Sequence, residues 1–352
     1  MSWRWSPASV LILLVAASVL LFVLYGLTAA PEVSSHSADS AMSATISLRS
    51  LLCVSLLAAR RGGIEVKNVH EKLIKNVKSK DGSLKNPVTD GDMRSHHAML
   101  RTLKDAFPHL KVTSEEHDPE AESQYANVHV GPADIACPEE VSKEIPDDTN
   151  LPVRDLHVWI DPLDATQEYT ESLLNYVTTM VGIAVNGKAV AGVIHKPFED
   201  MEDQQTFWAW KDHGISPNLQ PPTTSSSSNI KVIVSRSHSG DVDEVARKGF
   251  AGKSIEVLSA GGAGYKTLEV AAGRASVYLH TTKIKKWDLC APNGILNALG
   301  GRLSSFDGDE IDYSPGDAVH RGGVIAAHVD HAMYLDIFTS LSATSFRFRE
   351  DS

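Results

Sequence analysis

The stretch WIDPLDAT, residues 159–166, is the part of the 352-residue sequence that says most about the fold. Its apolar start is typical of a buried strand, and its small and hydroxyl residues predict a helix that opens at Gln167. Two carboxylates, Asp161 and Asp164, close the strand, where they repel each other and are costly to bury unless a cation neutralises them. Hard divalent cations such as Mg²⁺ prefer such oxygen ligands. A simpler interpretation also fits, in which Asp161 turns the chain and Asp164 caps the helix.

Three other segments carry acidic residues at the expected ends of elements. They are TDGD at residues 89–92 just before a helix, the Glu115-Glu116 pair after a short strand, and WDLCAP at residues 287–292, which places Asp288 ahead of a helix. Each segment alone has an alternative explanation as a helix cap or turn. Together with residues 159–166, they supply the several carboxylates that a two-metal phosphoryl-transfer site requires.

Composition excludes several classes of protein. The net charge is −11 and 42% of residues are hydrophobic, which argues against a nucleic-acid coat and against a disordered chain. Three scattered cysteines, Cys53, Cys137 and Cys290, form no C-x-x-C pair, so neither a zinc ribbon nor a disulfide scaffold is expected. A secreted domain could hold one disulfide, and at least one thiol would then stay free. The sequence contains no H-E-x-x-H motif, so a zinc hydrolase is not indicated.

The N-terminal region contains an uncharged, nearly continuous aliphatic run over residues 8–30. As a helix it would span roughly 35 Å, enough to cross a bilayer. The alternative is a cleaved signal peptide, whose apolar region is normally shorter. Because Arg4 precedes the run and acidic residues follow it, we predict a cytosolic tail over residues 1–7, an anchor over 8–30 and a stalk over 31–43, with the remainder luminal or outside.

The first half of the soluble part, residues 44–213, is predicted to be an α+β subdomain. From Thr45 the apolar spacing predicts a buried helix that closes at RRGG, residues 60–63. We treat residues 118–153, which are acidic and weakly periodic, as a surface excursion. Predicted strands cover residues 111–113, 157–160, 178–185 and 189–195, the last two joined by an Asn-Gly hairpin at 186–187, and a second helix covers residues 95–107.

The second half, residues 230–345, follows a low-complexity break at residues 214–229. Strands and helices are expected to alternate in it, which predicts an α/β subdomain. The expected strands are 230–234, 254–258 and 275–280, and the expected helices are 241–248, 264–272 and 291–299. A basic cluster, Lys283, Lys285 and Lys286, either faces solvent or steers an anionic substrate.

The four acidic motifs, in this order, resemble the signature set of the magnesium-dependent, lithium-sensitive phosphomonoesterases of the inositol monophosphatase and fructose-bisphosphatase superfamily. The resemblance covers about residues 45–345 and implies an α/β fold, the layered αβαβα sugar-phosphatase-like fold of two subdomains. One departure is Ala165, which stands where many members have glycine. Alanine keeps the backbone N–H, so phosphate binding is not threatened.

The resemblance also implies roles for individual residues. Two or three Mg²⁺ ions per site are expected. The implied metal ligands are Glu115, Asp161, the carbonyl of Leu163, Asp164 and Asp288. Asp92 and Thr166 match the positions that orient and deprotonate the attacking water, and the backbone N–H groups of Asp164, Ala165 and Thr166 would face the phosphate.

Two segments of the second half indicate the substrate. SRSHS at residues 235–239 and GGAGYK at 261–266 resemble the nucleoside-binding segments of the 3′(2′),5′-bisphosphate nucleotidase branch. The glycine-rich segment is neither a Walker A loop nor G-x-G-x-x-G, and alone it could be a tight connection. By the resemblance, Ser235, His238, Gly262 and Lys266 contact the AMP part of a small-molecule nucleotide, adenosine 3′,5′-bisphosphate.

Longer runs, such as VWIDPLDATQEYTE at residues 158–171 and GVIHKPF at 192–198, resemble Golgi-anchored members of that branch. This resemblance implies a single-pass protein of the Golgi membrane with a luminal catalytic domain. Two alternatives stay open: an inositol (poly)phosphate phosphatase with the same metal site, and a catalytically inactive anchored scaffold, although no expected metal ligand is missing. No nucleic-acid partner is expected, and the sequence leaves open whether the protein is a homodimer.

Overall fold

A computed structural model describes residues 44–79, 87–117, 137–219, 229–237 and 241–342. The chain divides into two units, residues 1–44 and 45–352, and the fold given below is that of the second. The predicted tail, anchor and stalk lie outside the described residues. Within the described ranges, no helix is both long and apolar enough to cross a membrane.

The first half of the fold is built on a six-stranded sheet with the order β2-β4-β5-β6-β7-β8. Strand β2 is parallel to β4, and the other neighbours are antiparallel. The turn between β5 and β6 has positive φ at Asn186 (49°) and Gly187 (76°), which agrees with the predicted Asn-Gly hairpin. The strands are β2 (Lys111–Ser114), β4 (Leu156–Asp164), β5 (Thr178–Val185), β6 (Lys188–His195), β7 (Thr206–Trp210) and β8 (Gly214–Ile215).

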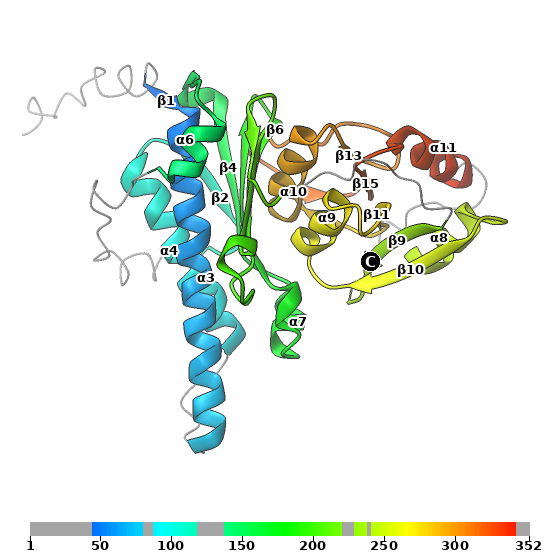
Figure 1. Cartoon of the computed structure of the whole chain (residues 1–352), viewed down its shortest axis with the longest axis horizontal. Coiled ribbons are helices and arrows are strands. Elements are labelled where there is room, and N and C mark those ends of the chain that lie inside the picture. Colours follow the sequence, from blue (N-terminus) through cyan, green and yellow to red (C-terminus); the bar gives the residue numbers. More distant parts are fainter. Residues whose placement is uncertain (1–43, 80–86, 118–136, 220–228, 238–240, 343–352) are drawn as a thin grey trace, which may run out of the picture. The chain divides into compact units, whose positions relative to one another are not determined.

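Helices α3 (Leu48–Ser79) and α4 (Pro87–Ala106) pack against each other and against this sheet (Figure 1). The prediction that the first helix closes at residues 60–63 was wrong, because α3 continues through both glycines. A Cβ atom at Gly62 would lie 2.6 Å from the Ser95 hydroxyl, and one at Gly63 would lie 2.5 Å from the His195 ring. These glycines therefore let α4 and β6 approach the helix closely rather than end it.

A five-stranded sheet with the order β10-β9-β11-β15-β13 forms the second half. Strands β10 and β11 are parallel to β9, whereas β15 is antiparallel to both β11 and β13. The strands are β9 (Ile230–Ser235), β10 (Ile255–Ala260), β11 (Val277–His280), β13 (Arg302–Ser304) and β15 (Val324–Ala327), and a separate two-stranded ladder joins β12 (Ile284–Lys285) to β14 (Val319–His320).

The helices of this half lie in two layers (Figure 1). Helices α9 (Ala263–Ala271) and α10 (Lys286–Ala298) lie between the two sheets: α10 packs on β5 and β6, and α9 packs on β9, β11 and β15. Helices α8 (Val242–Gly249) and α11 (His331–Ser342) pack together against the second sheet. The predicted α/β class is confirmed, and helices and sheets alternate in five layers.

Glycines set the distance between α10 and the first sheet. A Cβ atom at Gly192 on β6 would lie 2.2 Å from the backbone oxygen of Ala291, and one at Gly182 on β5 would lie 2.5 Å from Cys290 Cβ. Gly294 of α10 is equally close to the Ala191 backbone. Helix α10 therefore rests almost directly on the sheet backbone, although it belongs in sequence to the second half.

Several further boundaries differ from the predicted ones; among them, β8 lies within the predicted break at residues 214–229. Helix α4 begins at Pro87, so residues 89–92 lie within it and not ahead of it. Helix α10 begins at Lys286, which places Asp288 in its first turn, where the carboxylate accepts the Lys285 N–H at 3.1 Å. Part of the presumed excursion is ordered: α6 spans Glu139–Glu144, and β3 (Asn150–Pro152) pairs with β1 (Thr45–Ser47). Residues 118–136 lie outside the described residues.

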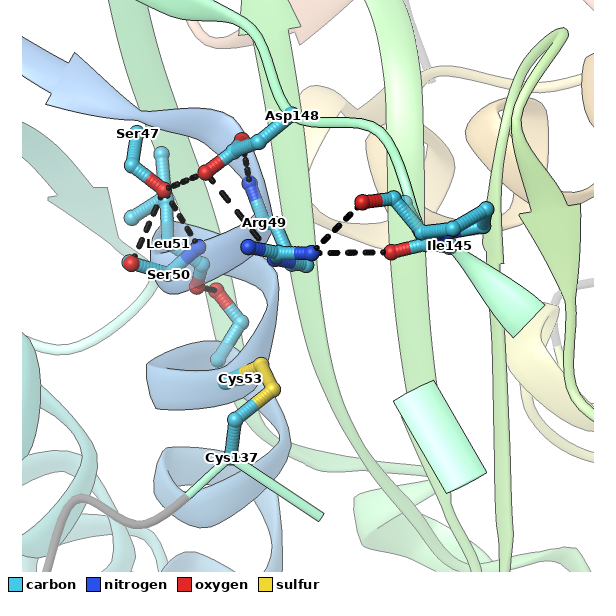
Figure 2. The surroundings of a disulfide bond; sticks show 10 residues. Ser47, Arg49, Ser50, Leu51, Cys53, Cys137, Ile145 and Asp148 are labelled. Atoms are coloured by element: carbon cyan, nitrogen blue, oxygen red, sulfur yellow. Dashed lines mark hydrogen bonds and ion pairs between the residues drawn. A yellow bond between two sulfur atoms is a disulfide. The ribbon is translucent and has the colours of Figure 1, made fainter. Parts of the chain in front are cut away.

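A disulfide joins Cys53 of α3 to Cys137, across 84 residues of sequence (Figure 2). The third cysteine, Cys290, is free and buried. Beside the disulfide, Arg49 donates to the backbone oxygens of Ile145 (3.1 Å) and Pro146 (3.0 Å). The start of α3 is thus held covalently and by hydrogen bonds to the segment around α6.

Candidate active site

A pocket of about 310 Å³ collects most of the predicted site residues from both halves of the fold. The predicted residues that line it are Glu115, Asp161, Leu163, Asp164, Ala165, Thr166, Ser235, Gly262, Lys266 and Asp288. Asp92 is not among the lining residues, and His238 lies outside the described residues. The sequence motifs, which are up to about 170 residues apart, therefore meet at one place.

An irregularity in β4 positions the two carboxylates of the central motif. Asp161 is paired with Met180 of β5 and Asp164 with Thr178, so β4 uses one residue more than β5 between these pairs. Such a bulge bends a strand and redirects its side chains. The Asp161 carboxylate accepts the N–H of Leu163 at 3.1 Å. The central motif is therefore a buried strand end shaped around its acidic residues.

The Asp164 carboxylate contacts elements from both halves of the fold. Its oxygens accept the N–H groups of Ala263 (3.1 Å) and Gly264 (2.8 Å) in the first turn of α9, and the hydroxyl of Thr178 (3.1 Å). The positive end of a helix favours a negative charge at this place. An ionised carboxylate offers about four acceptor positions, so Asp164 keeps capacity for a further ligand.

The acidic side chains in the pocket raise one another's pKa values. Burial and the neighbouring carboxylates raise the pKa of Glu115 to about 7 and that of Asp288 to about 8. Burial, with Glu115, Asp164 and Asp288 nearby, raises the pKa of Asp161 well above its usual range. Concentrated negative charge of this kind favours a bound cation. The ligand atoms are all oxygen, which fits a hard cation such as Mg²⁺.

Within the part of the chain that the structure describes, no three His, Cys, Asp or Glu side chains converge closely enough to form a ready-made metal site. The carboxyl groups line one pocket, and some of them interact directly: hydrogen bonds to Asp161 lower the pKa of Glu115 and of Asp288, against the larger effects that raise them. The candidate metal ligands therefore lie next to one another, and some of them are joined by hydrogen bonds rather than arranged around a common centre.

The two residues predicted to activate water differ in position. Thr166 opens the short helix α7 (Thr166–Thr170), lines the pocket, and donates its hydroxyl to the Leu163 carbonyl at 3.0 Å. Asp92 is buried within α4, with 5% of its surface exposed. Burial, with Glu116 and Glu115 nearby, raises the pKa of Asp92 to about 8. Asp92 therefore lies near Glu115 and Glu116, although it does not itself line the pocket.

Adjoining the acidic residues, the pocket carries the predicted nucleotide-contacting residues. Lys266 is 2% exposed, donates its Nζ to the Gly262 carbonyl at 2.5 Å, and lies 5.1 Å from the centre of the Tyr278 ring. Burial lowers the pKa of Lys266 to about 8, although Asp164, Glu168 and Asp288 act to raise it. Gly262 has a φ of 67°, and a Cβ there would lie 2.8 Å from Asp164 Oδ2, so only glycine fits.

Sequence reasoning missed some lining residues. Glu168, Tyr278 and His280 face the pocket but belong to no motif that indicates chemistry. Glu168 looked like one more polar residue of a helix, and its burial follows only from the packing of distant loops. Lys283 and Lys285, expected only as a cluster that might steer substrate, also line the pocket.

The layered fold and the acid-lined pocket define the class that the motifs predicted, a sugar-phosphatase-like α/β protein. The model of the inositol monophosphatase family matches residues 47–342, and the chain belongs to this family.

The similar curated proteins include phosphatases of two different names. The chain is 41% identical over 317 residues to the Golgi-resident adenosine 3′,5′-bisphosphate 3′-phosphatase of Bos taurus, a match that covers 88% of this chain and 84% of that protein. The Homo sapiens protein of the same name is 40% identical over 336 residues, covering 93% and 90%. Inositol monophosphatase 3 of Xenopus tropicalis is 44% identical over 309 residues, covering 83% and 81%.

Solved structures support the fold. Inositol monophosphatase from Anabaena superposes with a TM-score of 0.59 at 19% identity, covering 84% of this chain and 99% of that one. CysQ from Bacteroides thetaiotaomicron, a bacterial member of the family, gives a TM-score of 0.55 at 19% identity, covering 79% and 97%.

Proposed function

We propose that this protein hydrolyses the 3′-phosphate of adenosine 3′,5′-bisphosphate to give AMP and inorganic phosphate. One observation carries the proposal: a single pocket is lined by the acidic wall of Asp161, Asp164 and Asp288 and by the adjoining wall of Gly262 and Lys266. The first wall suits a phosphate bound through cations, and the second suits the rest of a nucleotide. The relatives named as adenosine 3′,5′-bisphosphate 3′-phosphatases support the same substrate.

The residues would divide the work as follows. Mg²⁺, held by Glu115, Asp161, Asp164, Asp288 and the Leu163 carbonyl, would supply positive charge that offsets the charge of the phosphate and activates water. The N–H groups of Ala165 and Thr166 would orient the reacting phosphate. The Thr166 hydroxyl would help orient the attacking water, and the water's proton would pass, by way of that hydroxyl, to the Asp92 carboxylate. Ser235, His238, Gly262 and Lys266 would hold the AMP part.

The decisive experiment compares kcat/KM of the full-length protein in detergent for three substrates: adenosine 3′,5′-bisphosphate, inositol 1,4-bisphosphate and inositol 1-phosphate. We expect the nucleotide to be preferred, with phosphate release that requires Mg²⁺ and stops when EDTA is added. Preference for either inositol phosphate would reject the nucleotide assignment. Absence of phosphate release from all three would favour an inactive scaffold.

A second candidate function is hydrolysis of inositol phosphates. It is favoured by the relatives named inositol monophosphatase 3, one of which is 44% identical to this chain. The acidic wall would serve both functions equally well, since it binds only the phosphate. The substrate comparison above decides between the two candidates.

We further propose that Li⁺ inhibits the enzyme, as the resemblance to lithium-sensitive phosphomonoesterases implies. Li⁺ would take the place of one Mg²⁺ in the acidic wall after hydrolysis, giving inhibition that is uncompetitive toward substrate. The test is turnover at increasing LiCl with NaCl at equal ionic strength as the control. Equal rates in both salts would contradict this proposal.

We also propose that the catalytic domain lies in the Golgi lumen behind a single N-terminal anchor. The charge pattern around residues 8–30 supports this topology. So does the Cys53–Cys137 disulfide, because disulfides persist in oxidising compartments. There the enzyme would remove the bisphosphate nucleotide that sulfotransferases release and that inhibits them. Protease added to sealed microsomes should spare the domain until detergent is added, and digestion without detergent would reverse the topology.

A further inference from the structure

Glu168 is a buried carboxylate beside the glycine-rich loop of the pocket. It lies in the first turn of α7, immediately after the central acidic motif, and only 1% of its side chain is exposed. It also lines the pocket. A buried carboxylate is costly unless it is paired and hydrogen-bonded, so its partners carry information about its role.

The partner of Glu168 comes from the other half of the fold. Arg236, directly after β9, places its Nε 3.3 Å from Glu168 Oε1, and its Nη2 binds Glu171 at the end of α7. The guanidinium thus spans two carboxylates of the same short helix. Its planar, forked arrangement of donors suits such a double contact, which a lysine could not reproduce.

The position of Arg236 in the chain connects its contact with α7 to the pocket. Ser235 and Ser237, on either side of it, both line the pocket. Arg236 itself is not among the lining residues, because its guanidinium binds the carboxylates of Glu168 and Glu171 instead. Its contact with α7 therefore fixes the orientation in which the serines face the pocket.

A second loop packs on the same carboxylate. A Cβ atom at Gly261 would lie 2.4 Å from the carboxyl carbon of Glu168, so the glycine-rich loop rests directly on it. The charge of Glu168 also acts to raise the pKa of Lys266, against the lowering effect of burial. Glu168 thus contacts or influences both segments that carry the proposed nucleotide contacts.

We propose that Glu168 and Arg236 form a positioning pair that sets substrate specificity: they hold residues 235–237 and 261–266 at the distance from the phosphate-binding wall that a nucleotide requires. The proposal rests on the proposed function. It predicts that loss of the pair weakens binding of the nucleotide part, while hydrolysis of a phosphate ester too small to reach those segments is nearly preserved.

The test measures kcat and KM of Glu168→Gln, Arg236→Met and Arg236→Lys with adenosine 3′,5′-bisphosphate and with a small ester, inositol 1-phosphate. We expect KM for the nucleotide to rise at least about tenfold in each variant, with less than about a threefold change in kcat/KM for the small ester. AMP binding, measured by calorimetry, should weaken by a similar factor. The double variant Glu168→Gln/Arg236→Met should be no worse than Arg236→Met alone, because that variant already removes the contact with Glu168.

Arg247→Met is the matched control. Arg247 pairs with Asp243 at 2.9 Å on the exposed face of α8. The substitution therefore removes an arginine–carboxylate pair without changing the pocket. It should leave both substrates unaffected.

Equal losses for the nucleotide and the small ester would reduce the pair to a structural role and overturn the proposal. An unchanged nucleotide KM in Arg236→Lys and Arg236→Met would overturn it too, even if Glu168→Gln does not fold. The unmodified protein distinguishes failure of the positioning pair from failure of the proposed function. If the unmodified protein does not prefer the nucleotide, the substrate assignment is wrong, and the specificity role of the pair is rejected with it.

Discussion

Ala165 adopts a left-handed backbone conformation, with φ of 68° and ψ of 46°, at the end of the central acidic motif. An L-residue with a Cβ is strained there by roughly 1–2 kcal/mol, whereas glycine is not. The motif needs this conformation because the chain leaves a bulged strand and enters α7 within one residue. Alanine therefore adopts a backbone conformation here that its Cβ atom disfavours.

We expect Ala165→Gly to stabilise the protein by about 0.5–1 kcal/mol, since relief of strain exceeds the added flexibility of the unfolded chain. Urea denaturation measures the change, and turnover should be retained because the N–H stays in place. Ala98→Gly, inside helix α4, is the control and should destabilise by a similar amount. Equal destabilisation by both substitutions would show that the conformation at residue 165 carries no strain.

Charge at Asp161 and Asp164 should be indispensable for turnover if they bind the cations. Asp161→Asn and Asp164→Asn keep the shape of the side chain but remove its charge, so kcat should fall at least about 100-fold. Steady-state kinetics across a Mg²⁺ titration provides the measurement. Asp243→Asn, on the exposed α8, should have no effect. Near-normal activity of either site variant at limiting Mg²⁺ would remove that residue from the proposed metal site.

The individual residues also show where prediction from sequence stops. Asp161, Asp164 and Asp288 could be found because clustered acids at element ends are unfavourable without a function. Glu168 could not be found in this way, since its importance comes from burial beneath two loops that lie about 70 and 90 residues further along the chain. Short-range patterns contain no record of such contacts.

At the scale of elements, the strands were easier to predict than the helix ends. The hairpin at residues 186–187 was confirmed because two positive-φ positions select Asn-Gly locally. The end of α3 was misjudged because glycines commonly stop helices, whereas Gly62 and Gly63 serve close packing against α4 and β6. Tertiary contacts overrode the local signal, and a single sequence shows only the local signal.

The Cys53–Cys137 bond should contribute measurably to stability. It closes a loop of 84 residues that includes part of α3, all of α4 and strand β2. Restricting the unfolded chain over such a loop is typically worth about 2–4 kcal/mol. We expect Cys53→Ser/Cys137→Ser to lose this amount in urea denaturation, and dithiothreitol to lower the stability of the unmodified protein only. Stability that is insensitive to both treatments would contradict a structural role for the bond.

For the whole molecule, the buried acids should make the metal-free protein less stable as pH rises. The folded-state pKa values of Asp92 and Asp288 are about 8 and that of Glu115 about 7, all above their ordinary values. Groups with raised pKa values stabilise the folded state at low pH, and this contribution is lost as pH rises through the folded pKa. His157 and His195, with pKa values lowered to about 4 by burial, are neutral in the folded protein over this range, and loss of the remaining protons from the unfolded chain offsets a small part of the effect.

Between about pH 6.5 and pH 8, the EDTA-treated protein should therefore lose about 1–3 kcal/mol of unfolding free energy. Urea denaturation at the two pH values provides the measurement, and Asp288→Asn should show a smaller loss. Excess Mg²⁺ should reduce the pH dependence, because a bound cation favours the ionised carboxylates. A free energy of unfolding that stays constant over this range would indicate that other groups already balance the charge of these acids without metal.

The positions of the three cysteines bear on how the protein is made. Cys53 and Cys137 have no other cysteine between them, and Cys290 follows about 150 residues later. In a chain that is translocated during its synthesis, at about 5–20 residues per second, the two native partners share the oxidising compartment for roughly 8–30 seconds before a competing thiol arrives. During that interval the only intramolecular pairing available is the correct one. If the chain is translocated as proposed, the spacing of its cysteines would thus protect oxidative maturation from mispairing until Cys290 is buried against β5.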